Sequence, residues 1–180
     1  MVRSSSPTAE CTRTPYAPFA VEGYYEKELI GMEFAFGSLL TEAESVPWIP
    51  LGPGESFKPL RFLAGNPGRV LLLRLDVGCV VPPHRHTGDV HAFNVEGSRE
   101  LIDSGQIVTA GDYVYEPAGN ADTWRVVGEG PCTVFIATRG AMEYLDEDGN
   151  VIRRDTTETM RETYERFCEG EGIEIVDLAG

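Results

Sequence analysis

The feature of this 180-residue chain that most limits its fold is a succession of short strand-like segments, separated by turns rich in glycine and proline. A hairpin is expected within Met142–Arg153, around the turn at Asp148 and Gly149. Seven further segments are predicted as strands: Arg69–Val77, Asp89–Glu96, 98–103, 106–109, Asp112–Glu116, Thr123–Val127 and Thr133–Thr138. Many short strands at close spacing are typical of an all-β sandwich or small barrel.

One C-terminal helix is also expected. Asp155 followed by Glu158 predicts its start as a variant capping box, and Gly170 predicts its end. Its apolar stripe has four members: Met160, Tyr164, Phe167 and Cys168. We expect this stripe to pack against the barrel.

The rest of the chain indicates one domain. Residues 1–20 are rich in Ser, Thr and Pro, which predicts a flexible, irregular N-terminal arm. A single domain is expected over residues 21–180, in which Trp48–Gly54 forms a turn-rich segment before the strands.

Composition narrows the possible partners and location. The net charge of −14 disfavours nucleic acid and anionic membrane surfaces, since both need a positive face. The four cysteines form no CxxC pair, so neither a disulfide framework nor a zinc knuckle is expected. We expect a cytoplasmic protein, because no secretory signal and no long apolar run is visible.

All three histidines of the chain lie between Pro82 and Gly97. His84 and His86 are two residues apart, so on a strand both side chains leave the same face. His91 follows a turn signal and is expected on the next strand, facing the same pocket. Imidazole is the commonest protein ligand for transition metals, so the three histidines predict one metal site.

Two segments resemble the paired motifs of the cupin superfamily. Residues 78–97 have the glycine, five-residue spacer and His-x-His of the first motif, with His91 at the position that usually holds Glu. Residues 111–124 have the glycine and Pro-x-Gly of the second motif, with Asp122 at the position of the remaining metal histidine. The resemblance implies a single-domain cupin: a small β-barrel or jelly roll with a C-terminal helix.

A closer resemblance lies in the strings HRHTGDVH and YEPAG. They are similar to the 2,4'-dihydroxyacetophenone dioxygenase group of cupins, which is related to the cupin domain of a zinc-binding anti-sigma factor. The similarity covers roughly residues 45–175 and leaves residues 1–44 unexplained. It implies cleavage of a carbon–carbon bond beside a ketone, with O2 and a mononuclear non-haem iron.

The candidate metal ligands are His84, His86, His91 and Asp122. His84, His86 and Asp122 would form the two-His, one-carboxylate triad of many Fe(II) oxygenases. Alternatively, His91 takes the third position and Asp122 orients a ligand, or the site binds no metal tightly. Fe(II) is the first expectation, with Mn, Co, Ni or Zn as alternatives. Asp103 is a further acidic candidate, although it also suits a turn.

The resulting functional hypothesis is a metal-dependent cupin dioxygenase that acts on an aryl, α-hydroxy or β-dicarbonyl ketone. Its partners would be the ketone and O2, and the resemblance implies a homodimer. The alternatives are a non-oxidative isomerase or cyclase on a polyketide-like ketone, and a non-catalytic metal-binding sensor. Five further residues are candidates for the pocket: Arg61, Arg74, Tyr113, Tyr115 and Trp124.

Overall fold

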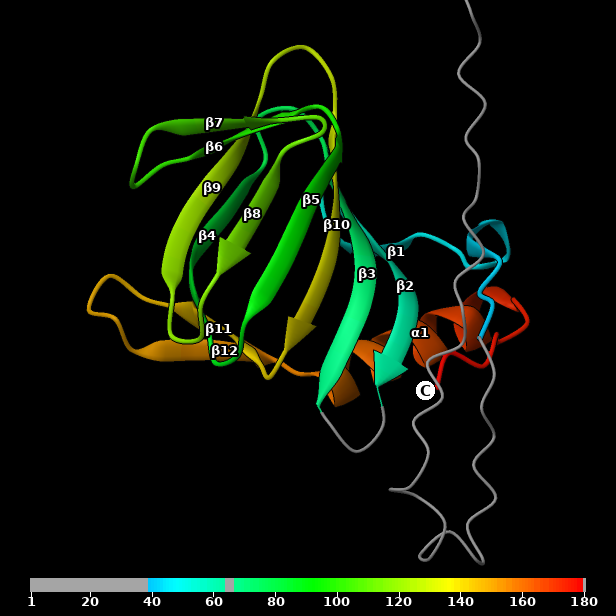
Figure 1. The fold of residues 1–180 in the computed structure, drawn as a ribbon. Coiled ribbons are helices and arrows are strands. Elements are labelled where there is room, and N and C mark those ends of the chain that lie inside the picture. Colours follow the sequence, from blue (N-terminus) through cyan, green and yellow to red (C-terminus); the bar gives the residue numbers. More distant parts are fainter. Residues whose placement is uncertain (1–38, 64–66, 180) are drawn as a thin grey trace, which may run out of the picture. The chain divides into compact units, whose positions relative to one another are not determined.

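A computed structural model describes residues 39–63 and 67–179 and shows a β-rich domain with one α-helix (Figure 1). A short 3-10 helix, η1, spans Ala43–Ser45, and α1 spans Thr157–Glu171. The strands are β1 Ile49–Gly52, β2 Glu55–Leu63, β3 Gly68–Leu75, β4 Val80–His86, β5 Val90–Glu96, β6 Ser98–Leu101, β7 Gln106–Thr109, β8 Tyr113–Glu116, β9 Ala121–Val127, β10 Cys132–Arg139, β11 Met142–Leu145 and β12 Val151–Asp155.

The strands form two antiparallel sheets that face each other (Figure 1). One has the order β1-β2-β3-β10-β5-β8, and the other has the order β12-β11-β4-β9-β6-β7. The predicted all-β class with a C-terminal helix is therefore confirmed. The inner faces enclose an apolar core, whose buried members are Leu75, Val81, Val90, Ala92, Trp124, Val126, Cys132 and Val134.

The strands predicted from alternation and turn residues are confirmed, including the hairpin of β11 and β12. The turn-rich interpretation of Trp48–Gly54 is wrong in part, because β1 lies there and pairs with β2. The prolines concealed both strands. Pro50 is tolerated because β1 is an edge strand, and Pro59 lies where the pairing of β2 with β3 shifts register.

The helix α1 is capped slightly later than predicted. Thr156, rather than Asp155, is the N-cap: its hydroxyl accepts from the Thr159 backbone N at 3.2 Å, and Thr159 Oγ1 accepts from the Thr156 backbone N at 2.8 Å. The helix passes Gly170 and ends before Gly172, whose φ of 67° is left-handed.

The predicted apolar stripe of α1 packs against β1, β2 and β3, as Figure 1 shows for the helix as a whole. Phe167 lies partly buried at its edge. The fully buried members of this second cluster are Val46, Ile49, Phe57, Phe62, Leu71, Met160, Tyr164, Cys168 and Leu178.

The predicted N-terminal arm over residues 1–20 and the domain boundary at residue 21 lie outside the described residues. Among residues 39–63 and 67–179, no helix is both long and apolar enough to cross a membrane.

Gly97, the last glycine of the first motif, shows why that position excludes other residues. Its φ is 71°, and an added Cβ would lie 2.1 Å from the Pro131 carbonyl oxygen. Both the left-handed backbone and the close approach to the backbone at Pro131 require glycine.

One carboxylate on β11 binds an arginine from each of its two neighbouring strands, β4 and β12. Arg85 lies between His84 and His86 on β4 and faces outward, where its Nε donates to Glu143 Oε2 on β11 at 3.0 Å. Arg154 on β12 donates to the other oxygen of Glu143. These hydrogen bonds hold the pKa of Glu143 below its ordinary value.

We predict that Glu143→Gln lowers the free energy of unfolding at pH 7 by about 1 kcal/mol, since both arginines are well exposed. A lowered pKa stabilises the fold fully above the unfolded value of about 4.3, and this contribution is lost as pH falls through the folded value. Urea unfolding of both proteins between about pH 7 and pH 3 should show the difference shrink only in acid. A difference that stays constant across this range contradicts the prediction.

Candidate metal centre

A bulge in β4 turns both histidines toward the interior. Val81 pairs with Trp124 on β9, but His84, three residues later, pairs with Asp122, only two residues earlier on β9. The extra residue falls at Pro82 and Pro83, which cannot donate to the ladder. It reverses the alternation, so Val81, His84 and His86 are all buried.

His84 and Asp122 form the first close pair of the site. His84 Nε2 lies 2.9 Å from Asp122 Oδ1, yet Asp122 Oδ1 has no hydrogen-bond partner and is buried. His84 Nδ1 lies 2.9 Å from the Pro82 carbonyl oxygen, so Nδ1 carries the proton. In the neutral ring, Nε2 then presents a lone pair toward a carboxylate oxygen. Two such atoms at this distance need a proton or a cation near both of them.

His86 and Glu116 form the second pair, next to the first. His86 Nε2 lies 3.5 Å from Glu116 Oε2, while His86 Nδ1 is buried without a hydrogen-bond partner. The rings of His84 and His86 meet edge-on, with centroids 4.9 Å apart. The site therefore consists of two histidine–carboxylate pairs side by side, on strands β4, β8 and β9.

The pKa values reflect this crowding. Burial and the adjacent His84 lower the pKa of His86 to about 4, so this ring is neutral. Burial opposes protonation of His84 as well, but the Asp122 carboxylate outweighs it and raises the pKa of His84. Burial and the Asp122 charge raise the pKa of Glu116.

Two carboxylates and one guanidinium surround the histidines. Glu116 and Asp122 are both poorly exposed, and they lie close enough to favour the charged form of the buried Arg99. Its guanidinium packs over Trp124, with 4.9 Å to the ring centroid, and its Nε donates to Asn94 Oδ1 at 3.1 Å. A divalent cation would neutralise the remaining charge.

The donor set suits such a cation. Two imidazoles that can be neutral and two carboxylates are ligands that Fe, Mn, Co, Ni and Zn accept. Across the described part of the chain, however, no three His, Cys, Asp or Glu side chains already converge as a metal site.

The structure does not bring His91 to this cluster. Val90 and Ala92 face the core, so the alternation of β5 directs His91 to the outer face, where its side chain is 49% exposed. There, Nδ1 contacts the Tyr113 hydroxyl at 2.7 Å and Nε2 lies 3.3 Å from Asp89 Oδ2. The expectation that His91 faces the same pocket as His84 is therefore corrected.

The other candidates from the sequence lie elsewhere. Asp103 is exposed in the turn between β6 and β7. Tyr113 and Tyr115 are about half exposed on the outer face beside His91, and Trp124 is in the core. Two arginines also point away: Arg61 binds Thr41 and Ala179, and Arg74 lies exposed near Trp48.

Sequence reasoning missed Glu116. It precedes Pro117 at the end of β8 and reads as a polar strand terminus, yet it is only 6% exposed. The available signal was the alternation of Tyr113, Val114, Tyr115 and Glu116, in which the even positions face inward.

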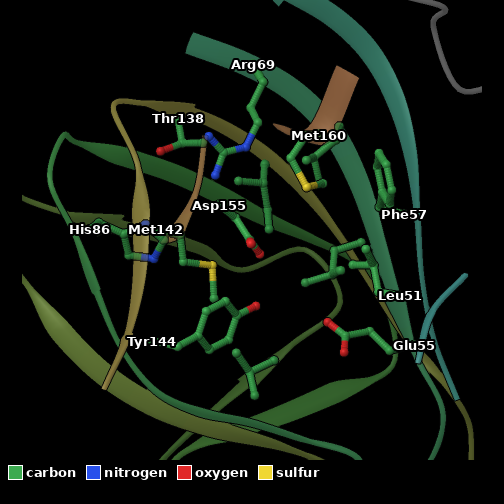
Figure 2. A pocket seen from close by; sticks show the side chains of 14 residues that line it. Leu51, Glu55, Phe57, Arg69, His86, Thr138, Met142, Tyr144, Asp155 and Met160 are labelled. Carbon is green, nitrogen blue, oxygen red and sulfur yellow. The ribbon is translucent and has the colours of Figure 1, made fainter. Parts of the chain in front are cut away.

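A cavity opens beside His86, between the two sheets and α1 (Figure 2). Its cavity volume is about 60 Å³. Most of its wall is aliphatic, aromatic or methionine side chains, among them Leu51, Phe57, Met142 and Met160. Arg69, Thr138, Tyr144, Glu55 and Asp155 supply the polar groups.

The fold and the motifs agree with comparisons to known proteins. A cupin protein of the RmlC-like type from Ralstonia eutropha JMP134 is 26% identical, covers 80% of this chain and 95% of its own, and superposes with a TM-score of 0.76. An acetylacetone dioxygenase from Acinetobacter johnsonii (15% identity, 80% and 98% coverage, TM-score 0.64) shares the fold. So does the polyketide cyclase RemF from Streptomyces resistomycificus (18% identity, 63% and 90% coverage, TM-score 0.50).

None of the curated proteins compared with the sequence matches it. Residues 37–142, which include both motifs, match the family described as the ChrR cupin-like domain. The match confirms the resemblance to cupins, and the chain belongs to the ChrR cupin-like domain family.

Proposed function

We propose that the protein is a metal-dependent dioxygenase that cleaves a carbon–carbon bond beside a ketone. The observation that supports this most directly is the buried pair of His84 and Asp122, whose Nε2 and Oδ1 atoms lie 2.9 Å apart in the interior beside a second histidine–carboxylate pair. His84, His86 and Asp122 would hold the metal, and Glu116 would contact His86. The metal is Fe(II) by preference, and it would act as a Lewis acid toward the ketone and its neighbouring oxygen.

The chain's own residues supply position and environment. The bulge carbonyl of Pro82 holds His84 in the tautomer that keeps Nε2 free. The low pKa of His86 keeps that ring unprotonated at neutral pH. The apolar wall of the cavity beside His86 excludes water and accepts an aryl or alkyl group.

The substrate class follows from this cavity and from relatives of the same fold. Acetylacetone dioxygenase is one such relative, which favours a β-dicarbonyl or an α-hydroxyketone. With 2-hydroxyacetophenone, one O2 would be consumed per ketone and the products would be benzoic and formic acids. With pentane-2,4-dione, the same uptake would give acetic acid and methylglyoxal.

A second candidate is a non-oxidative cyclase or isomerase, and Glu116 favours it. This carboxylate is buried, its pKa is raised, and it is free to accept a proton if the metal does not bind it. A polyketide cyclase shares the fold.

The test is oxygen uptake by the protein loaded anaerobically with Fe(II), with either ketone as substrate. We expect one O2 per ketone, and a rate at least about 100-fold lower in His86→Ala. His91→Ala is the matched control and should keep the wild-type rate, because that side chain lies on the outer face. Conversion of a ketone without oxygen would favour the cyclase, and a metal-loaded protein inert toward every ketone would contradict both.

A further inference from the structure

A buried arginine stands in the wall of the cavity without an acidic partner. Arg69 on β3 is 4% exposed, and its one hydrogen bond with a described residue runs from Nη1 to the Gly140 carbonyl oxygen at 3.1 Å. None of the ion pairs between described residues includes it. Figure 2 shows its guanidinium between the Thr138 hydroxyl and Asp155, directed into the cavity.

The position of this cation is unusual for a structural residue. Arginine stays charged even when buried, and the nearby carboxylates of Asp155 and Glu158 favour its charged form without forming an ion pair with it. Asp155, the nearest acidic side chain in this view, is already bound to Arg153 at 3.0 Å. Arg69 thus retains donors that a ligand in the cavity can use.

The two ends of the cavity differ in character. Arg69 and His86 lie at one end. Leu51 and Phe57 lie at the other end, where the Glu55 carboxylate also borders the cavity. A ligand would fit both ends of the cavity if it carried an anionic group next to a carbonyl at one end and an apolar body at the other.

We propose that Arg69 makes this cavity selective for a small organic acid, whose anionic group pairs with the guanidinium while its apolar body lies against Phe57 and Leu51. The acid's role as the ketone substrate rests on the proposed function. The binding of the acid does not rest on it, because an acid can bind in the cavity beside Arg69 without being converted.

The test compares 3-benzoylpropionate with its methyl ester, which is neutral and larger by one methyl group. Calorimetric titration of the purified protein, with its metal content measured, should show the acid bound at least about 10-fold more tightly than the ester. Equal affinity for the two, or no binding of either, overturns the proposal without needing a variant.

Variants locate the effect. Arg69→Met should weaken binding of the acid by about 10- to 100-fold and leave the ester within about 3-fold. Arg74→Met is the matched control, since Arg74 lies on the same strand but faces solvent. If Arg69→Met does not fold, Arg69→Lys should still weaken the acid several-fold, because it replaces a planar fork by a point charge. Undiminished preference for the acid in either folded variant overturns the assignment to Arg69.

These outcomes separate this proposal from the proposed function. Selective binding of the acid by a protein without oxygen uptake would leave Arg69 supported and the dioxygenase contradicted. Oxygen uptake with equal affinity for acid and ester would do the reverse.

Discussion

Replacing His84 with alanine is expected to lower the affinity for a divalent transition metal by more than about 100-fold. Residues that only orient metal ligands already contribute about 10- to 100-fold, and His84 supplies the donor atom itself. It also leaves Asp122, which is 13% exposed, without its partner at 2.9 Å. Anaerobic titration of metal-free protein with Co(II), followed by visible absorption, measures the affinity.

Two comparisons decide between the arrangements that the sequence left open. His91→Ala should keep the wild-type affinity, since the side chain points away from the cluster. Asp122→Ala should lose as much affinity as His84→Ala if the carboxylate is a ligand, and about 10- to 100-fold if it only orients His84. Strong loss in His91→Ala with none in His84→Ala would refute the site.

Replacing Phe57 with alanine is expected to lower the free energy of unfolding by about 3–5 kcal/mol. Phe57 is fully buried on β2, in the cluster that holds α1 against the sheet, and it also forms a wall of the cavity. Truncation therefore removes apolar contacts and enlarges a space that is already present. Urea unfolding followed by circular dichroism measures the loss.

Phe93→Ala is the matched control, because Phe93 lies on β5 of the same sheet but is 44% exposed on its outer face. Its loss should stay near about 0.5 kcal/mol. Comparable destabilisation of the two variants would contradict the placement of the core.

Most of the strands followed from local sequence, because alternation and turn residues act over a few neighbouring positions. Val90, Ala92 and Asn94 on β5 alternate with exposed residues, and the Asp148–Gly149 turn lies between β11 and β12. The β1–β2 hairpin was missed because its prolines are acceptable only at an edge and at a register shift. Both are properties of the pairing between strands.

The site was predicted in part for the same reason. His84 and His86 share a face by local geometry, and the motif spacing indicated Asp122. The direction of His91 depends on which alternate residues of β5 face the core. Its proximity in sequence to the other histidines suggested that it faces inward, which is wrong. Glu116 lies on β8 of the facing sheet and Arg99 on β6, two strands away from β4. The alternation of β8 marked Glu116 as facing inward, but no local pattern placed either residue beside the histidines.

We propose that the cluster of His84, His86, Glu116 and Asp122 binds one divalent metal ion. Anomalous diffraction at the metal edge, from crystals of the protein loaded anaerobically with Fe(II), tests it most directly. One strong peak per chain is expected, within about 2.0–2.3 Å of His84 Nε2 and Asp122 Oδ1. No peak in this cluster, or a peak at His91 and Asp89 on the outer face, would contradict it.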